Sequence, residues 1–362
     1  MRIAQVAPLY ECVPPRLYGG TERVVAYLTD ELVRQGHEVT LFASGDSKTA
    51  AEHVPIGRCA TRLDPDCRDP LARHIVLLER VFSRVAEFDV VHFHIDYLHF
   101  PLTRRYRESN LTTLHGRLDI PDLAYLYDEY TEMPVVSISN SQRAPLPHLN
   151  WLGTVHHGLP LDLYSFRERP EGYLAFCGRI SPEKRPDRAI RIAERAGVKL
   201  LMAAKVDAAD REYFEDVIRP MLDSPWVEYV GEIGEAEKTD FLGNARALLF
   251  PIDWPEPFGL VMIEALACGT PTIAYARGSV PEVLEHGVTG FIVHDRDEAV
   301  RAVDLVPSLD RRRCRDVFER RFSAERMTAD YLALYERVIE RALDGTAGQT
   351  ATVGRARDER VA

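Results

Sequence analysis

Short apolar runs alternate with amphipathic stretches of helical spacing along almost the whole chain. A predicted strand at residues 2–6 leads through a loop to a helix at 22–35 and a strand at 39–42, and the same alternation resumes after residue 172. Strands that alternate with helices form parallel sheets with helices on both faces. The pattern therefore predicts an α/β fold with two doubly wound parallel sheets and a cleft between them.

The polar segment 167–172 separates the two halves of this pattern. The 362 residues are 46% hydrophobic, which is enough for two domains with cores of their own. We predict a first domain at 1–166, a second at 167–330, a C-terminal helix at 331–344 that could pack back on the first domain, and a flexible tail at 345–362. The proline-rich stretch 44–70 is expected to be irregular.

Charge and cysteine content exclude several classes of protein. The formal net charge of -11 argues against a nucleic-acid or polybasic membrane partner. The six cysteines form no C-x-x-C pair, so neither a disulfide framework nor a zinc site is expected. The chain begins directly with a predicted strand, without a signal peptide or an apolar run of membrane-spanning length, so we expect a cytoplasmic protein.

A segment in the second half, EPFGLVMIEALACGTP at residues 256–271, combines two glutamates with a predicted helix start. It follows a buried apolar run at 247–250, so Glu256 lies in a loop at the carboxyl end of a strand and Glu264 lies inside the helix. The backbone N–H groups at Phe258, Gly259 and Leu260 are free at a helix start, where they can hold a phosphate.

Two further loops between a strand and a helix contain glycine. One carries Gly178, Arg179 and Lys184, and such cations suit a diphosphate, although a solvated basic turn is the alternative. The other ends in Tyr18, Gly19 and Gly20, which lack the G-x-G-x-x-G spacing of dinucleotide-binding proteins. These two glycines predict either a close approach to a ligand or a tight turn.

Histidines and aspartates also follow predicted strands. His92, His94 and Asp96 could bind a metal, but no third partner at ligand spacing is evident, and hydrogen bonding to neighbouring loops is favoured. For His115, which precedes Gly116, a functional and a structural role are equally supported. The sequence Asp64-Pro-Asp66 is interpreted as a turn and not as a metal motif, so no metal site is predicted.

Together with Gly287-Val-Thr-Gly290, these motifs resemble those of the retaining GT-B glycosyltransferases of family 4. The resemblance extends from the first strand to about Tyr335 and implies two Rossmann-like domains. It implies that Arg179 and Lys184 bind the diphosphate of a nucleotide-sugar donor, assisted by the N–H groups of residues 258–260. It implies that Glu264 contacts the ribose and that Glu256 contacts hydroxyls of the transferred sugar. It also implies that His115 contacts the sugar near its reacting carbon, and that Gly19 and Gly20 contact the phosphate or the acceptor.

The resemblance implies transfer of a hexose from a UDP-glucose or GDP-mannose type of donor to an acceptor hydroxyl, without a metal or other cofactor. The acceptor could be a sugar, a small molecule or a lipid-linked compound, and the sequence leaves the oligomeric state open. A nucleotide-sugar epimerase or hydrolase and a non-catalytic nucleotide-sugar-binding module are the alternatives. The chain has His157-Gly158 where the family often has Asn-Gly, and the roles of His92, His94, Asp96 and His157 stay open.

Overall fold

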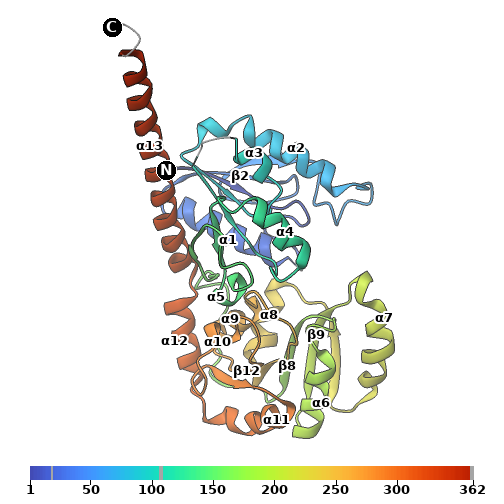
Figure 1. The fold of residues 1–362 in the computed structure, drawn as a ribbon. Helices are drawn as coiled ribbons and strands as arrows, with labels where there is room; N and C mark the ends of the chain where they lie inside the picture. The colour runs from blue at the N-terminus through green and yellow to red at the C-terminus, as the bar shows by residue number, and fades with distance from the viewer. Residues whose placement is uncertain (18, 106–108, 359–362) are drawn as a thin grey trace.

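The structure is a computed structural model that describes residues 1–17, 19–105 and 109–358, with side chains as far as residue 343. The described residues form two parallel sheets, of seven and six strands, with helices packed on both faces of each (Figure 1). This confirms the predicted fold of two doubly wound α/β sheets. Tyr18, from the predicted double-glycine loop, lies outside the described residues.

The first sheet has the strand order β3-β2-β1-β4-β5-β6-β7. The order reverses direction between β1 and β4, which is where open parallel sheets bind ligands at the carboxyl ends of their strands. Its strands are β1 (Arg2–Val6), β2 (Glu38–Ser44), β3 (Glu52–Ile56), β4 (Val90–Phe93), β5 (Asn110–Thr113), β6 (Val135–Ser137) and β7 (Trp151–Thr154). Its helices are α1 (Gly20–Arg34), α2 (Pro70–Phe82), α3 (Phe100–Thr103), α4 (Pro121–Glu129) and α5 (Asn140–Arg143), with a 3₁₀ turn at Val85–Glu87.

The second sheet has the order β10-β9-β8-β11-β12-β13, with its reversal between β8 and β11. Its strands are β8 (Leu174–Arg179), β9 (Leu200–Lys205), β10 (Val227–Gly231), β11 (Ala247–Phe250), β12 (Thr272–Tyr275) and β13 (Gly290–Val293). Its helices are α6 (Pro186–Ala196), α7 (Arg211–Tyr213), α8 (Glu235–Gly243), α9 (Leu260–Ala267), α10 (Val280–Val283) and α11 (Arg296–Leu305). Short 3₁₀ or π turns occupy Ala208–Asp210, Phe214–Ile218, Arg219–Asp223 and Val306–Ser308.

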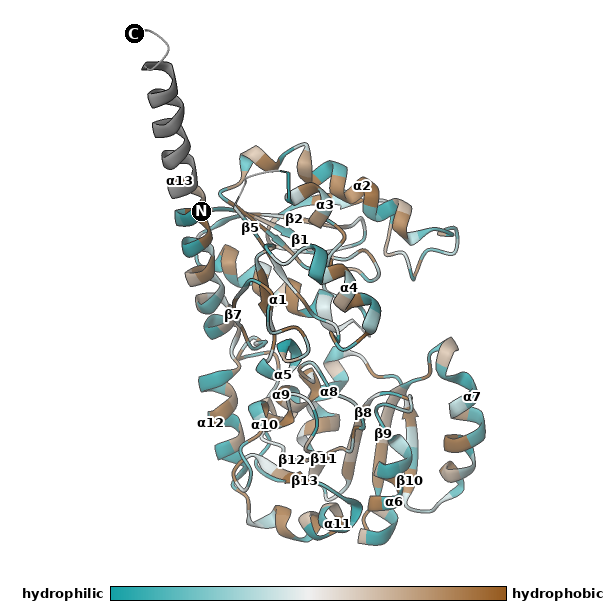
Figure 2. Ribbon diagram, in the orientation of Figure 1, coloured by the Kyte–Doolittle hydropathy of each residue, from teal (hydrophilic) through white to brown (hydrophobic). Residues whose placement is uncertain are grey.

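Alternating side chains of the second sheet enter two separate cores. Leu248 and Ala274 pack with α8, α9 and α12 (Arg311–Arg321) on one face, whereas Leu249 and Ile273 pack with α6 and α11 on the other. Because both faces of a parallel sheet are covered, its central strands β11 and β12 are buried throughout, whereas the edge strand β10 is only partly buried and contains Glu228. Figure 2 shows brown segments in the strands of this sheet. The outer helices α6 and α11 mix brown and teal because only one side of each is buried.

The C-terminal helices connect the two sheets. Helix α12 (Arg311–Arg321) packs on the second sheet, and α13 (Ala324–Asp358) then runs back along the first (Figure 1). Met327, Tyr331 and Tyr335 of α13 are fully buried with Ile3 and Val90 of the first sheet. One face of the first core is therefore completed by residues that lie more than 230 positions beyond Val90 in the sequence.

Two details differ from the sequence prediction. Residues 44–70 are not irregular throughout, because Glu52–Ile56 forms β3 at the edge of the first sheet, paired only with β2. Its proline is tolerated because an edge strand has one unpaired side. Helix α13 begins at Ala324, before the C-terminal helix that was predicted at 331–344, and it continues to Asp358. The flexibility expected of the tail at 345–362 stays a prediction. Residues 359–362 of that tail lie outside the described residues.

No helix in the described part of the chain is both long enough and apolar enough to cross a membrane.

Candidate active site

A cavity of about 520 Å³ lies between the carboxyl ends of the two sheets. This volume is typical of small-molecule sites. All eleven residues predicted from the sequence line it, although they come from loops throughout the chain. They are Gly19, Gly20, His115, Gly178, Arg179, Lys184, Glu256, Phe258, Gly259, Leu260 and Glu264.

The loop between β11 and α9 brings a helix start to this cavity. Gly259 precedes α9 with a φ of 79°, in the left-handed region that favours glycine. A Cβ atom at Gly259 would lie 2.8 Å from the side chain of Met262 and 3.2 Å from Phe250, so the loop has no space for a larger residue. The first-turn N–H groups of α9 have no partner within the helix and can bind an anion.

Helix α1 begins opposite α9, across the cleft. Gly19 has a φ of 149°, and a Cβ atom there would lie 2.7 Å from Pro15, so glycine is required. A Cβ atom at Gly20 would lie 3.5 Å from the side chain of Leu260 in the second half. The two predicted helix starts therefore lie against each other at the cavity.

Lys184 and Glu256 form an ion pair in the cavity wall. Glu256 is buried and also accepts a hydrogen bond of 3.0 Å from the indole N–H of Trp254. The Lys184 ammonium lies 5.0 Å from the centre of the Trp254 ring, a cation–π distance. One of the two predicted cations is thus neutralised by the glutamate predicted to bind sugar hydroxyls.

Arg179 is surrounded by carboxylates. Its guanidinium lies 3.1 Å from Glu183, 3.5 Å from Asp210 and 3.9 Å from Asp207. The cation-rich loop predicted from the sequence is therefore balanced by acidic side chains from the loop itself and from the turn after β9. Those partners were not predicted, since Asp207 and Asp210 follow a different strand, β9.

Glu264 pairs with a residue that the sequence analysis missed. Lys238 of α8 lies 2.7 Å from the Glu264 carboxylate, and both side chains are nearly buried. Burial opposes the charge on Lys238, but Glu264 and Glu235 outweigh it and raise its pKa. Lys238 belongs to no short motif, and only its approach to Glu264 in space reveals its place.

His115 follows β5 and contacts two other histidines. Its Nε2 lies 2.9 Å from Nδ1 of His94, and its ring stacks on His157 with the centroids 5.3 Å apart. Burial lowers the pKa of His115 to about 3, so the ring is neutral at physiological pH. A neutral ring can donate or accept a hydrogen bond but cannot neutralise a phosphate.

A chain of buried hydrogen bonds fixes the tautomer of His115. The amide oxygen of Gln5 accepts a 2.8 Å bond from Nε2 of His94, so Nδ1 of His94 is an acceptor and Nε2 of His115 must donate to it. The Gln5 amide nitrogen donates to the hydroxyl of Tyr335, which also lies 2.8 Å from His92. His92 in β4 and His94 just after it are therefore hydrogen-bonded, but only His115 among their partners lies in a neighbouring loop, and the others lie in β1, β5 and α13. The part of the chain that is described contains no group of three potential metal ligands.

Two aspartates considered at the sequence level have distinct surroundings. Asp96 lines the cavity with a φ of 52°, which is unusual for a residue other than glycine. The Asp96 side chain is exposed to the cavity, and partial desolvation by the cavity walls raises the pKa of its carboxylate, although the His115 backbone N–H donates to it. Asp64 lies in a turn, where it accepts from the Asp66 amide and pairs with Arg73 at 2.7 Å, as the turn interpretation expected.

Two family models match adjoining parts of the chain. The model for glycosyltransferase family 4 matches residues 18–175, and the model for glycosyl transferases group 1 matches residues 166–317. Together they cover residues 18–317, which include every strand except β1 and every residue that was predicted to line the cavity.

Curated relatives carry glycosyltransferase names. An uncharacterised glycosyltransferase of Methanocaldococcus jannaschii is 25% identical over 356 residues, which span 85% of this chain and 89% of that protein. The D-inositol 3-phosphate glycosyltransferase of Mycobacterium marinum is 31% identical over 180 residues, which span 42% of this chain and 36% of the relative. The chain therefore matches only about a third of the length of that second relative.

Solved structures share the whole two-sheet arrangement. AviGT4, a glycosyltransferase involved in avilamycin A biosynthesis, superimposes with a TM-score of 0.73 at 24% identity, covering 94% of this chain and 98% of that one. Sucrose-phosphate synthase from Thermosynechococcus elongatus superimposes with a TM-score of 0.76 at 18% identity, covering 94% of this chain and 99% of that one. HepE from Anabaena, solved with UDP and glucose, superimposes with a TM-score of 0.73 at 17% identity, covering 93% of this chain and 100% of that one. At these identities the likeness concerns the fold.

Proposed function

The chain is a GT-B glycosyltransferase of the family 4 and group 1 type, and from this we propose that it transfers a hexose from a nucleotide diphosphate sugar to an acceptor hydroxyl with retention of the anomeric configuration. In that reaction the bond between the sugar carbon and the diphosphate oxygen breaks, and its electron pair leaves with the diphosphate. The acceptor oxygen forms the new bond and gives up its proton to the departing diphosphate.

One observation carries this proposal: cations, a helix start and a neutral histidine meet at one cavity. Lys184 and Arg179 lie beside the start of α9 on the second sheet, and His115 faces them from the first. Fixed cations and N–H groups stabilise the charge that develops on a departing diphosphate. The neutral ring of His115 suits a hydrogen bond to a sugar hydroxyl. This set of groups can serve without a metal, which is part of the proposal.

The ion pair between Lys184 and Glu256 gives the second half a way to respond to the donor. A diphosphate offers Lys184 more negative charge than a single carboxylate does, so it competes for the ammonium. Release from Lys184 would leave Glu256 held by Trp254 and free to accept hydrogen bonds from the sugar. The same side chain therefore neutralises the cation before binding and recognises the sugar afterwards.

We propose a UDP-linked donor, with a GDP-linked one as the alternative. Support comes from HepE, whose structures contain UDP, UDP with glucose, or UDP-glucose. A thermal-shift panel of UDP, GDP, ADP and their sugars tests the base, because a ligand at about 100 times its Kd adds roughly 2.7 kcal/mol of stability. No stabilisation by any of these nucleotides would contradict the proposed donor class.

Replacement of Lys184 or Arg179 by Ala tests the diphosphate contact. Each variant should lose well over tenfold in donor affinity, because a hydrogen bond to a charged group contributes about 1.5 to 3 kcal/mol. Lys199→Ala is the control, since this lysine pairs with Glu228 at the surface, away from the cavity. Calorimetric titration with the donor selected by the panel measures the change. Equal affinities in all three variants would contradict the assignment.

The family models favour transfer over epimerisation, hydrolysis or binding without chemistry, because they describe transferases. Incubation with the donor alone distinguishes these reactions. A transferase should release nucleotide slowly until an acceptor is added, whereas rapid stoichiometric conversion of the donor alone would indicate an epimerase or a hydrolase.

A further inference from the structure

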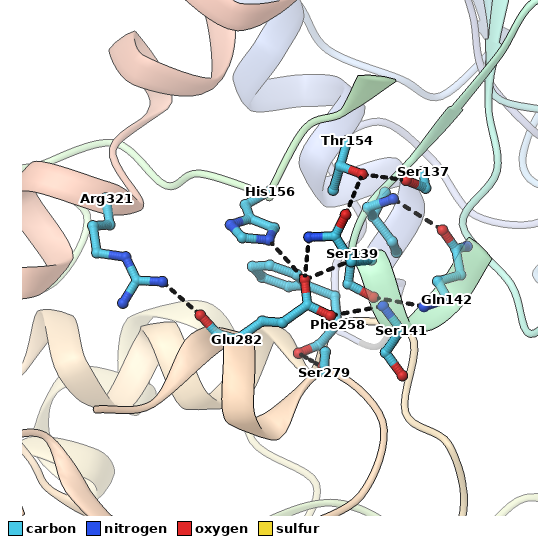
Figure 3. A network of polar contacts seen from close by, with 12 residues as sticks. Ser137, Ser139, Ser141, Gln142, Thr154, His156, Phe258, Ser279, Glu282 and Arg321 are labelled. Carbon is cyan, nitrogen blue, oxygen red and sulfur yellow. Dashed lines mark hydrogen bonds and ion pairs between the residues drawn. The ribbon is translucent and has the colours of Figure 1, made fainter. Parts of the chain in front are cut away.

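The short helix α5 contacts both sides of the cavity at once. It belongs to the first half of the chain. The hydroxyl of its N-cap residue Ser139 accepts a 3.0 Å hydrogen bond from the backbone N–H of Gln142. Figure 3 shows the two side chains in a polar network that reaches Phe258, Ser279 and Glu282 of the second half. Neither Ser139 nor Gln142 lines the cavity, and neither belongs to a motif identified in the sequence.

Gln142 holds the loop that carries His115. Its amide nitrogen donates to the carbonyl of Leu114 at 2.8 Å and to that of Gly116 at 2.7 Å, the residues on either side of His115. Its amide oxygen accepts a 2.9 Å bond from the N–H of Ile138. The side chain is buried, so these contacts use both of its donors and fix its orientation. The backbone at His115 is thereby tied to α5 from both directions.

Ser139 holds the loop that carries Glu256. Its hydroxyl is fully buried and donates to the carbonyl of Pro257 at 2.7 Å, across the boundary between the two halves. Ser279 binds the two neighbouring carbonyls. Its backbone N–H donates to the carbonyl oxygen of Glu256 at 3.0 Å, and its hydroxyl donates to the carbonyl oxygen of Phe258 at 2.8 Å. Three consecutive carbonyls of this loop therefore have fixed hydrogen-bond donors.

These fixed carbonyls decide where the following N–H groups point. In a planar trans peptide the C=O and the next N–H point in opposite directions. With the Pro257 and Phe258 carbonyls bound to Ser139 and Ser279, the N–H groups of Phe258 and Gly259 point away from those serines. They are two of the three N–H groups predicted to assist in binding the diphosphate.

A third contact anchors α5 to the second half. The carboxylate of Glu282 in α10 accepts hydrogen bonds from the backbone N–H of Asn140 at 2.8 Å and of Ser141 at 2.7 Å (Figure 3). Because Ser279 precedes the same short helix, α5 and α10 together grip the Glu256 loop. Movement of α5 would displace the His115 loop and the Glu256 loop together.

We propose that Ser139 and Gln142 are positioning residues that set the separation of His115 and Glu256, and so determine how tightly the sugar of the donor is held. This inference rests on the proposed function, in which the diphosphate of the nucleotide is held mainly by Arg179, Lys184 and the start of α9, whereas the sugar lies between His115 and Glu256. Loss of either side chain should therefore weaken the binding of a nucleotide sugar more than that of the free nucleotide.

Calorimetric titration of Ser139→Ala and Gln142→Met with UDP and UDP-glucose, and with GDP and GDP-mannose, tests the proposal. The affinity for the nucleotide sugar relative to its nucleotide should fall about three- to tenfold, the effect of losing one hydrogen bond. Ser44→Ala is the matched control for the serine, since Ser44 is equally buried but its hydroxyl donates to Asp46 at 2.8 Å, away from α5. Asn150→Ala is the control for the glutamine, since the Asn150 amide donates to the carbonyl of Glu132 at 2.9 Å, away from α5.

Hydrogen exchange of the same variants, without any ligand, separates this inference from the proposed function. Removal of the Ser139 hydroxyl should speed amide exchange at residues 114–118 as well as at 256–260, and Gln142→Met should do the same. Equal losses for nucleotide and nucleotide sugar, or exchange changes confined to the loop that each side chain touches, would overturn the proposal. If the native protein binds none of UDP, UDP-glucose, GDP and GDP-mannose, the proposed function fails. Hydrogen exchange alone then decides whether α5 couples the two loops.

Discussion

Charged side chains at the cavity are neutralised in pairs before any substrate arrives. Lys184 contacts Glu256, Lys238 contacts Glu264, and Arg179 lies among three carboxylates. Glycine spacing and strand ends located Lys184, Glu256, Arg179 and Glu264 in the sequence, because a loop between strand and helix has a recognisable composition. Asp207 and Asp210 follow β9 and Lys238 lies in α8, so no local pattern could associate them with Arg179 and Glu264.

The pair formed by Lys238 and Glu264 should behave as a unit in stability measurements. Lys238→Met leaves a buried carboxylate without a partner and should cost about 3 kcal/mol or more, as loss of one member of a buried ion pair does. Glu264→Gln should also destabilise, whereas the double variant should lose much less than the sum of the two. Urea unfolding at pH 7 measures this cycle. Additive losses would show that the two residues are not coupled.

Among the elements, the shortest helices have the largest influence on the cavity. The strands β8 and β11 and the helices α6 and α9 were predicted because apolar periodicity extends over enough residues to be recognised. Helices α5 and α10 have four residues each, too few for a period, yet they hold the loops of His115 and Glu256. Edge strand β3 was missed for a related reason, since its charged residues and proline lack an apolar pattern.

Acid should weaken the contact between α5 and α10. Burial by itself would raise the pKa of Glu282, but hydrogen bonds from His156, Asn140 and Ser141 lower it to about 2. A carboxylate with a depressed pKa stabilises the fold above about pH 4.5, and this contribution disappears as the pH falls toward 2. It amounts to at most about 3 kcal/mol at neutral pH.

Urea unfolding of Glu282→Gln at several pH values checks this expectation. The variant should be less stable than the native protein at pH 7, and the difference should shrink steadily below about pH 4.5. Glu285→Gln is the control, because Glu285 pairs with Arg321 at 3.0 Å in a more exposed position. A difference that does not vary with pH would show that the charge on Glu282 does not stabilise this contact.

On the scale of the whole molecule, the chain crosses between its two sheets twice. The connection after β7 leads to the second sheet, and α13 returns to cover the first. The hydroxyls of Tyr331 and Tyr335 bond Thr113, Gln5 and His92 within the first core. Through Gln5 and His94, this C-terminal helix is linked by hydrogen bonds to His115 at the cavity.

Truncation should reveal how much the first half depends on α13. A chain ending at residue 324 loses Met327, Tyr331 and Tyr335 from the core, and its first sheet should unfold or aggregate, because large buried side chains contribute about 3 to 5 kcal/mol each. A chain ending at residue 343 keeps these side chains and should melt close to the native temperature. Scanning calorimetry of both truncated proteins measures the effect, and equal melting temperatures would contradict it.

The sequence by itself determined the two doubly wound sheets and eleven residues of the cavity, because periodicity, glycine spacing and residues at strand ends are local properties. It also supplied the resemblance that the family models bear out. Only the tertiary structure decided which charges pair, how His94 and Gln5 fix the tautomer of His115, and that α5 touches the loops of both halves. Those contacts join residues that are far apart in the sequence and are brought together only by tertiary packing. The spacing of these residues along the chain therefore does not predict the contacts.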